Sequence, residues 1–163
     1  MIAGIDPGLT GALAFLDPDN PTTVATFDIP VHQLARGGKT KREIDAVGLA
    51  ALLAQQPIAH AFVEAAGARP GQGTASMFAF GRAYGIVIGI LAAHHTPLTL
   101  VAPGIWKRHI GVDKSKDSSR ARASQLLPHC ADQWPLKKDH GKAEACLLAL
   151  YGVRMLNGTA ERR

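Results

Sequence analysis

The chain has 163 residues, of which 47% are hydrophobic, and this length and composition suit one domain with its own core and exclude a disordered chain. Its formal net charge of +5 favours a polyanionic partner, above all a nucleic acid. The two cysteines lack metal-binding or redox spacing, which indicates a reducing compartment. No apolar run matches a bilayer span and no signal peptide is evident, so we expect no membrane association and a cytoplasmic location.

The first element is the apolar run from Ile2 to Ile5, which reads as a buried strand ending at Asp6. Pro7 and Gly8 stop this strand, and the apolar run Ala12–Leu16 predicts that the two segments form a tight hairpin. A carboxylate at the end of a buried strand is costly unless a cation or donor meets it. Asp6 is therefore either a turn former that bonds its own backbone or a functional acid.

The segment from Thr22 to Pro30 predicts a third strand, which completes a meander. Residues 36–43 are polar and basic without periodicity, which favours a solvated surface loop over an arm that touches phosphates. Residues 45–56 have helical spacing of their apolar positions. Because a helix precedes it, the apolar segment from Ile58 to Ala66 is expected to pair in parallel with the first strand.

Glu64 stands at the carboxyl end of that strand, as Asp6 does at the end of the first one. Ligand sites of open α/β sheets lie beyond the carboxyl ends of the strands. Two adjacent parallel strands would place both acids on the same rim, where a shared cation would offset their charge. We therefore favour a functional role for both.

A long apolar helix is predicted over residues 74–94, and Gly81, Gly85 and Gly89 repeat along one of its faces. Such a face allows close approach of another backbone. Either tight packing against the sheet or a helix–helix contact between two copies of the chain would use it.

A fifth strand over residues 97–101 precedes a short helix over 103–111 with Trp106 as its apolar anchor and Lys107 and Arg108 exposed. The helix expected over 113–127 opens with the densest basic patch of the chain. This patch is either a solvated helix face or a track for phosphates. It contains Lys114, Lys116, Arg120 and Arg122.

The last predicted helix, residues 141–156, is apolar nearly all round, which indicates burial. Glu144 lies within it, four residues after His140 and on the same face. Asp139 is explained equally well as a helix N-cap. Together with Asp6 and Glu64, these residues form an oxygen-rich set of the kind that suits Mg²⁺ or Mn²⁺, and a pair of such ions can drive phosphodiester cleavage.

Four short motifs occur in a fixed order: Gly4–Gly8, Phe62–Glu64, Gly81–Gly85 and Lys142–Ala145. In this order, over residues 1–155, the chain resembles the RuvC-type Holliday junction resolvases of the ribonuclease H-like superfamily, and it looks closer to phage or prophage versions. The resemblance implies an α/β fold with a five-stranded mixed sheet, made of a three-strand antiparallel meander plus two parallel strands, with helices on both faces. The expected domain covers residues 1–156, followed by a tail over 157–163.

The resemblance further implies a homodimer that binds a four-way DNA junction and nicks two strands symmetrically with Mg²⁺, for which Mn²⁺ can substitute, using two ions. Asp6 and Glu64 match family metal ligands, and Glu144 falls where the family usually has Asp. The family's other C-terminal ligand would fall at Gly141, so we expect His140, and after it Asp139, to replace it. The residues expected to contact nucleic acid are Arg69, Arg82, Lys107, Arg108, Lys114, Lys116 and Arg120.

Three alternatives remain open at this point. One is a ribonuclease H-like nuclease that acts on another branched or hybrid nucleic acid, and another is a non-catalytic junction-binding protein. The third is an actin-like or sugar-kinase-like ATPase, whose first hairpin also has the Asp-x-Gly-x-Thr pattern of residues 6–10. That class needs two such domains, for which this chain is too short.

Overall fold

The computed structural model describes residues 1–36, 39–65, 67, 71, 73–113 and 117–160. The strands are β1 (Ile2–Ile5), β2 (Ala12–Leu16), β3 (Val24–Asp28), β4 (Val31–Arg36), β5 (Lys39–Ile44), β6 (His60–Glu64) and β7 (Leu98–Val101). The α-helices are α1 (Ala46–Ala54), α2 (Thr74–Ala93), α3 (Pro103–Ile110), α4 (Ser118–Leu126) and α5 (His140–Ala160), with short 3₁₀ turns η1 (Pro128–Gln133) and η2 (Lys137–Asp139) between α4 and α5.

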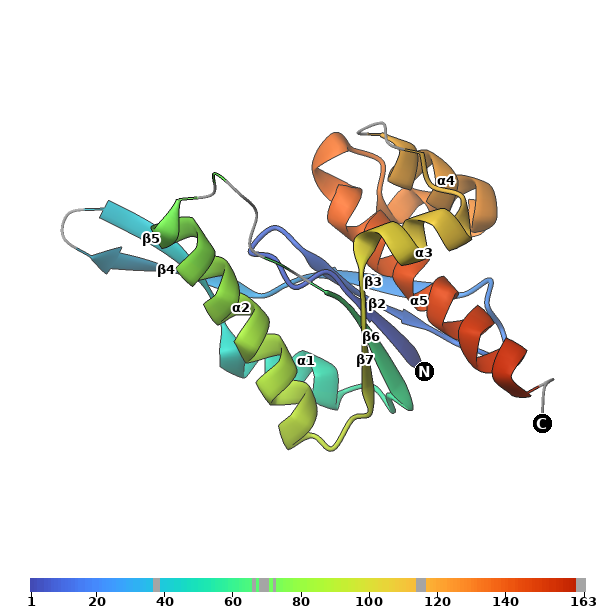
Figure 1. Cartoon of the computed structure of the whole chain (residues 1–163), viewed down its shortest axis with the longest axis horizontal. Coiled ribbons are helices and arrows are strands. Elements are labelled where there is room, and N and C mark those ends of the chain that lie inside the picture. Colours follow the sequence, from blue (N-terminus) through green and yellow to red (C-terminus); the bar gives the residue numbers. More distant parts are fainter. Residues whose placement is uncertain (37–38, 66, 68–70, 72, 114–116, 161–163) are drawn as a thin grey trace.

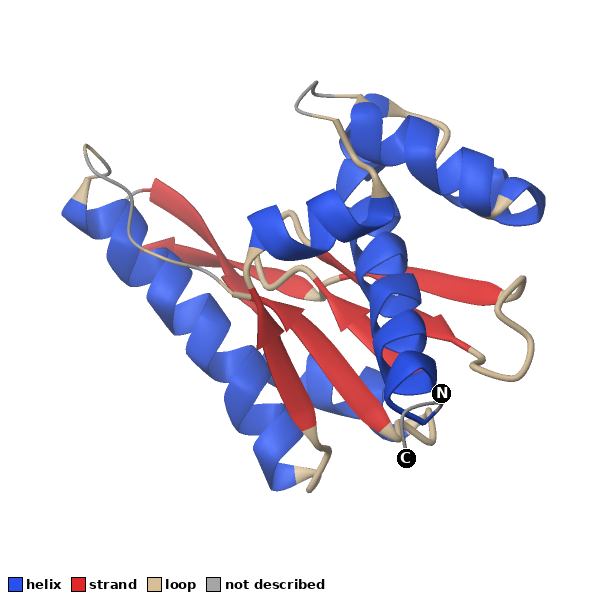
Figure 2. Ribbon diagram, turned by 45° about the vertical axis from the view of Figure 1, so that its right-hand side comes forward, coloured by secondary structure: helices blue, strands red, loops and turns tan. Residues whose placement is uncertain are grey.

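A five-stranded mixed sheet in the order β3-β2-β1-β6-β7 forms the centre of the molecule (Figure 1). The β1–β2 and β2–β3 pairs are antiparallel, whereas β6 lies parallel to both β1 and β7. Helices α1 and α2 cover one face of the sheet and α5, with α3 and α4 beside it, covers the other (Figure 2). The predicted fold class is thereby confirmed.

Side chains of the central strands alternate between two hydrophobic cores, as the two-residue period of a strand requires. Ile5 and Leu13 pack with Leu91 of α2 on one face. Ile2 and Leu16 pack with the apolar residues of α5 on the other. Because both faces of β1 and β2 are covered, all nine of their residues are buried.

Helix α5 approaches the sheet closely because glycines lie at the contact. A Cβ at Gly4 of β1 would collide with the backbone of Ala145 and Ala149, and one at Gly152 would collide with the ring of Phe62. The small residues therefore set the distance between the helix and the strand that ends at the first acid.

The segment predicted as a basic surface loop is instead part of an antiparallel β-hairpin, β4–β5, with its own two-stranded sheet. Its register runs from Val31↔Ile44 to Arg36↔Lys39. Ile44 at the base is buried, but the outer part exposes both of its faces. The prediction failed because a strand without a buried face has no apolar alternation to reveal it.

The boundaries of the C-terminal elements also differ from the prediction. Helix α4 begins at Ser118 rather than near residue 113, and α5 continues to Ala160. The expected end of the domain at residue 156 thus falls inside a helix, and the division into a domain and a tail stays a prediction.

Helix α2 exposes an apolar surface. This 20-residue helix is long and apolar enough to cross a membrane by length and composition, contrary to the sequence-based expectation, and only 17% of its 18-residue apolar window is buried. This criterion is weak, because core helices of soluble proteins also meet it. Nothing lies within 4 Å of a Cβ built at Gly81, Gly85 or Gly89, so these glycines do not pack against the sheet.

We expect the substitution Gly4→Ala to destabilise the fold by about 2–3 kcal/mol, because the new methyl group has only backbone to displace. Denaturant unfolding measures this change. Gly104→Ala is the control, since nothing lies within 4 Å of its Cβ position. Equal stability of the Gly4→Ala variant and the wild type would contradict the close approach of α5.

Candidate active site

Two acids lie side by side at the carboxyl ends of parallel strands. Asp6 directly follows β1, and Glu64 is the last residue of β6. The register pairs Ile5 with Val63, so each acid stands one residue beyond the same rung of the ladder. Helix α5 starts at this end of the sheet and brings Glu144 to the pair, as the mutual effects of the three charges show.

Burial raises the pKa of Asp6 above its ordinary value, and the neighbouring charge of Glu144 raises it further. The backbone N–H of Gly8, 3.4 Å from Oδ1, and the charges of His140 and Lys107 act in the opposite direction. The hydrogen bond from Gly8 is the turn-forming role that the sequence offered for Asp6. Because it does not cancel the rise in pKa that burial and repulsion cause, the carboxylate still favours a nearby cation.

Burial also raises the pKa of Glu64, with further contributions from Asp6 and Glu144. The indole Nε1 of Trp106 donates a hydrogen bond of 2.9 Å to Glu64 Oε2, which stabilises the ionised form and lowers the pKa. Lys107 lowers it as well. The indole also fixes the direction of the carboxylate.

Glu144 is held by two donors that share its Oε1 atom. Lys107 Nζ lies 2.7 Å from this oxygen and Ser119 Oγ lies 2.8 Å from it. Ser119 is buried although it is polar, which this bond explains. The ammonium group of Lys107 is therefore an internal counter-charge for the acidic cluster, which we define as Asp6, Glu64 and Glu144.

The two residues considered for a fourth position differ in their surroundings. The carboxylate of Asp139 accepts a hydrogen bond of 2.9 Å from the backbone N–H of Leu136 and so closes the turn before α5. His140 begins α5, and its charge acts on Asp6. A Cβ at Gly141 would lie 2.9 Å from the carbonyl oxygen of Thr10, so the backbone leaves little room for a side chain there. Of the two, His140 thus acts electrostatically on the acidic cluster, whereas Asp139 closes the turn before α5.

Two solved structures have a similar arrangement of elements. One, titled T. thermophilus RuvC in complex with Holliday junction substrate, gives a TM-score of 0.57 at 14% identity, and the match covers 94% of this chain and 95% of that one. The other, Thermus thermophilus RuvC, gives 0.53 at 16% identity with the same coverage. The chain has the RuvC fold. At such low identity the likeness shows the fold alone; no protein-family model and no curated protein matched the sequence.

The donor set of this chain is chemically suited to Mg²⁺ or Mn²⁺, because carboxylates dominate it and two of them, Asp6 and Glu64, are partly buried with raised pKa values. Among the described residues, however, no three His, Cys, Asp or Glu side chains converge closely enough to hold an ion. Glu144 is turned to Lys107 and Ser119 instead. A metal ion would therefore compete with Lys107 for Glu144.

The predicted nucleic-acid contacts fall into different environments. Lys107 joins the acidic cluster and Arg108 lies exposed in the last turn of the same helix. Arg82 is ion-paired with Glu43 at 2.7 Å and so connects α2 to β5. The others, Arg69, Lys114 and Lys116, lie outside the described residues.

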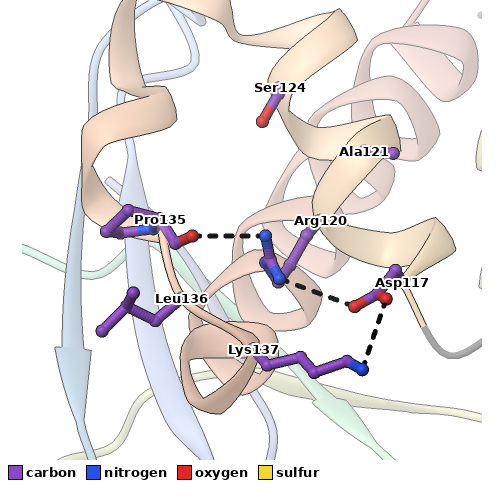
Figure 3. A pocket seen from close by; sticks show the side chains of 7 residues that line it. All are labelled: Asp117, Arg120, Ala121, Ser124, Pro135, Leu136 and Lys137. Atoms are coloured by element: carbon purple, nitrogen blue, oxygen red, sulfur yellow. Dashed lines mark hydrogen bonds and ion pairs between the residues drawn. The ribbon is translucent and has the colours of Figure 1, made fainter.

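Arg120 has a structural role in the RuvC-like fold of this chain. Its guanidinium donates to the carbonyl oxygens of Trp134 and Pro135 at 3.2 and 3.3 Å and pairs with Asp117 at 3.5 Å. Figure 3 shows it turned inward, in a pocket that Lys137 also lines. In this arrangement Arg120 holds the segment before α5 rather than a phosphate track.

Sequence reasoning missed two residues of the site. Trp106 was expected only as an apolar anchor, and its indole N–H gave no separate signal. Ser119 was not identified, because nothing in the sequence distinguishes it from the serine that precedes it. Only the packing of α3 and α4 on α5 shows that both side chains support the acids.

We expect Asp6→Asn to stabilise the metal-free protein at neutral pH. Because the pKa of Asp6 is raised in the folded state, the folded protein holds a proton that the unfolded chain releases, and wild-type stability falls as pH rises from about 4. The Asp6→Asn variant has no carboxyl group to titrate at this position, so its stability should fall less as the pH rises. Denaturant unfolding at pH 4 and pH 7 with a chelator measures it.

In the same assay, Mg²⁺ at a hundredfold its Kd should stabilise the wild type by about 2.7 kcal/mol and the variant by less. If the stability of the variant depended on pH and on Mg²⁺ in the same way as that of the wild type, Asp6 would not belong to the acidic cluster.

Proposed function

We propose that this chain is a Mg²⁺-dependent, structure-selective endonuclease that resolves four-way (Holliday) DNA junctions by paired symmetric nicks. The observation that supports this most directly is the acidic cluster. Three acids from β1, β6 and α5 act on one another's charges at the rim of a RuvC-type sheet. A module that only bound DNA would gain nothing from buried carboxylates that repel phosphate.

Each residue of the cluster has a role that follows from its contacts. Bound Mg²⁺ would activate water and stabilise the leaving oxygen in phosphodiester cleavage. Asp6 and Glu64 would supply ligand oxygens, with Trp106 fixing the direction of Glu64. Glu144 would supply a third when it exchanges Lys107 for the ion, and Ser119 would keep it oriented. His140 would complete the site as a ligand or by positioning the water.

The substrate is proposed from charge and from one structural neighbour. The net charge of +5 gives a nucleic acid a favourable field in spite of the acids. The RuvC of one comparison is described in complex with a Holliday junction substrate. Branched or hybrid nucleic acids of other kinds would meet the same metal chemistry, so the assay below includes them.

A homodimer is proposed from the exposed apolar face of α2. Phe78 is 73% exposed there, and the Cβ positions of Gly81, Gly85 and Gly89 are open. Exposed apolar surface of this kind marks an interface, and glycines permit close helix crossing. Two copies joined through α2 would carry two acidic clusters, as paired nicks require.

The activity is tested by a nicking assay with Mg²⁺ on a synthetic four-way junction, a linear duplex of the same sequence and an RNA–DNA hybrid. We expect paired symmetric nicks in the junction only. Asp6→Asn, Glu64→Gln and Glu144→Gln should each lower the rate by at least about 100-fold, because each removes a proposed metal ligand, while junction binding persists. Cleavage of the hybrid alone would overturn the substrate, and tight binding without any cleavage would favour a binding protein.

The dimer is tested by Gly85→Arg, which places a charge on the open face of α2. Sedimentation should give twice the monomer mass of 17.2 kDa for the wild type and the monomer mass for the variant. Gly104→Arg, at an equally open position in α3, should stay dimeric. A dimeric Gly85→Arg variant would contradict the α2 interface, and association of the wild type with lipid vesicles would favour a membrane role for the helix.

A further inference from the structure

The β4–β5 hairpin is basic, and it contains the segment for which an arm that touches phosphates was the alternative to a solvated loop. Residues 31–44 contain Arg36, Lys39, Lys41 and Arg42 against a single acid, Glu43. Arg82 already pairs with that acid at 2.7 Å. By composition the segment therefore carries a net positive charge.

The described side chains of the outer half of the hairpin are exposed rather than packed in the core. His32, Gln33 and Leu34 on β4 and Thr40, Lys41 and Arg42 on β5 are all exposed. A two-stranded hairpin is marginally stable by itself, and only its base is buried, at Ile44. A polar, cationic and doubly exposed pair of strands is suited to contact a partner rather than to support the core.

Arg42 ties this arm to the active site. Its Nη2 donates a hydrogen bond of 3.2 Å to the carbonyl oxygen of Leu9, which lies in the turn between Asp6 and β2. The remaining guanidinium N–H groups are donors for a phosphate. In the register Arg42 pairs with Gln33 and Thr40 with Ala35, so the amide and hydroxyl side chains lie on the same face as Arg42.

We propose that this face of the hairpin, formed by Gln33, Thr40 and Arg42, binds the phosphate backbone of the DNA arm that leaves the acidic cluster on the side of α2. The inference rests on the proposed function, since a strand held at Asp6 must pass the Leu9 turn. Figure 1 shows the hairpin projecting beyond the sheet next to the start of α2. Arginine, lysine, amide and hydroxyl groups are the donors that proteins use for phosphates.

The test is equilibrium binding of the full-length protein to a labelled four-way junction and to a duplex, in a chelator and over a series of salt concentrations. The substitution Arg42→Ala should weaken junction binding about tenfold and reduce the slope of log K against log salt by about 0.9, the contribution of one phosphate contact. Arg154→Ala, which removes an exposed charge near the far end of α5, should change neither.

Arg42→Lys separates charge from anchoring. The Arg42→Lys variant should keep the salt slope of the wild type. If its slope instead fell as much as that of Arg42→Ala, the hydrogen bond to Leu9 would be the whole role of Arg42, and the phosphate contact would be overturned. An unchanged slope in the Arg42→Ala variant would overturn it too, even if the wild type resolves junctions. If the wild type cleaves no substrate but binds DNA with a salt slope that the hairpin substitution lowers, the proposed function fails and the DNA contact of the hairpin is supported. A wild type that binds no nucleic acid overturns both.

Discussion

The close approach of α5 to β1 is the contact on which the site depends. Glu144 lies near enough to act on the charge of Asp6 because Gly4 lets the helix backbone lie against the strand and Gly141 lets its first turn lie against Thr10. The same approach buries nearly every side chain of α5 up to Val153. The position of α5 therefore determines both the packing of the core and the arrangement of the acids. Moving the helix outward by the width of a methyl group would weaken the core and would also move Glu144 away from Asp6.

The acidic cluster is electrostatically unfavourable by itself, and its neighbours show how the fold tolerates it. Mutual repulsion and burial raise the pKa values of Asp6 and Glu64. The Lys107 ammonium group from α3 opposes both rises, and the Trp106 indole opposes the rise for Glu64. A buried cluster with too little positive charge is one that a divalent cation stabilises strongly. The ion pair of Lys107 with Glu144 supplies part of this missing positive charge.

Much of this arrangement is predictable from sequence because it follows from local rules. Apolar runs bounded by turn formers locate the central strands, and acids at the carboxyl ends of parallel strands locate Asp6 and Glu64. Glu144 is recognisable as a charge in an otherwise apolar helix. The supporting contacts are not predictable in this way, because the Ser119 bond depends on how α4 packs on α5. The hairpin was missed for a similar reason, since strands exposed on both faces carry no apolar pattern.

The arginines show why charge in a sequence does not map directly onto a binding surface. Arg82, Arg120 and Arg122 lie in stretches that read as basic patches or helix faces, but each is engaged inside the chain, by Glu43, by the carbonyls of residues 134 and 135, and by the Ile110 carbonyl. Among the described residues, this leaves cations on two sides of the acids, on α3 and on the hairpin. A phosphate backbone crossing a negatively charged rim needs attraction on both sides of it, because the acids alone would repel the strand. Some basic residues thus form bonds within the chain, and others lie beside the acids. The second group allows one small domain with an acidic centre to bind a polyanion.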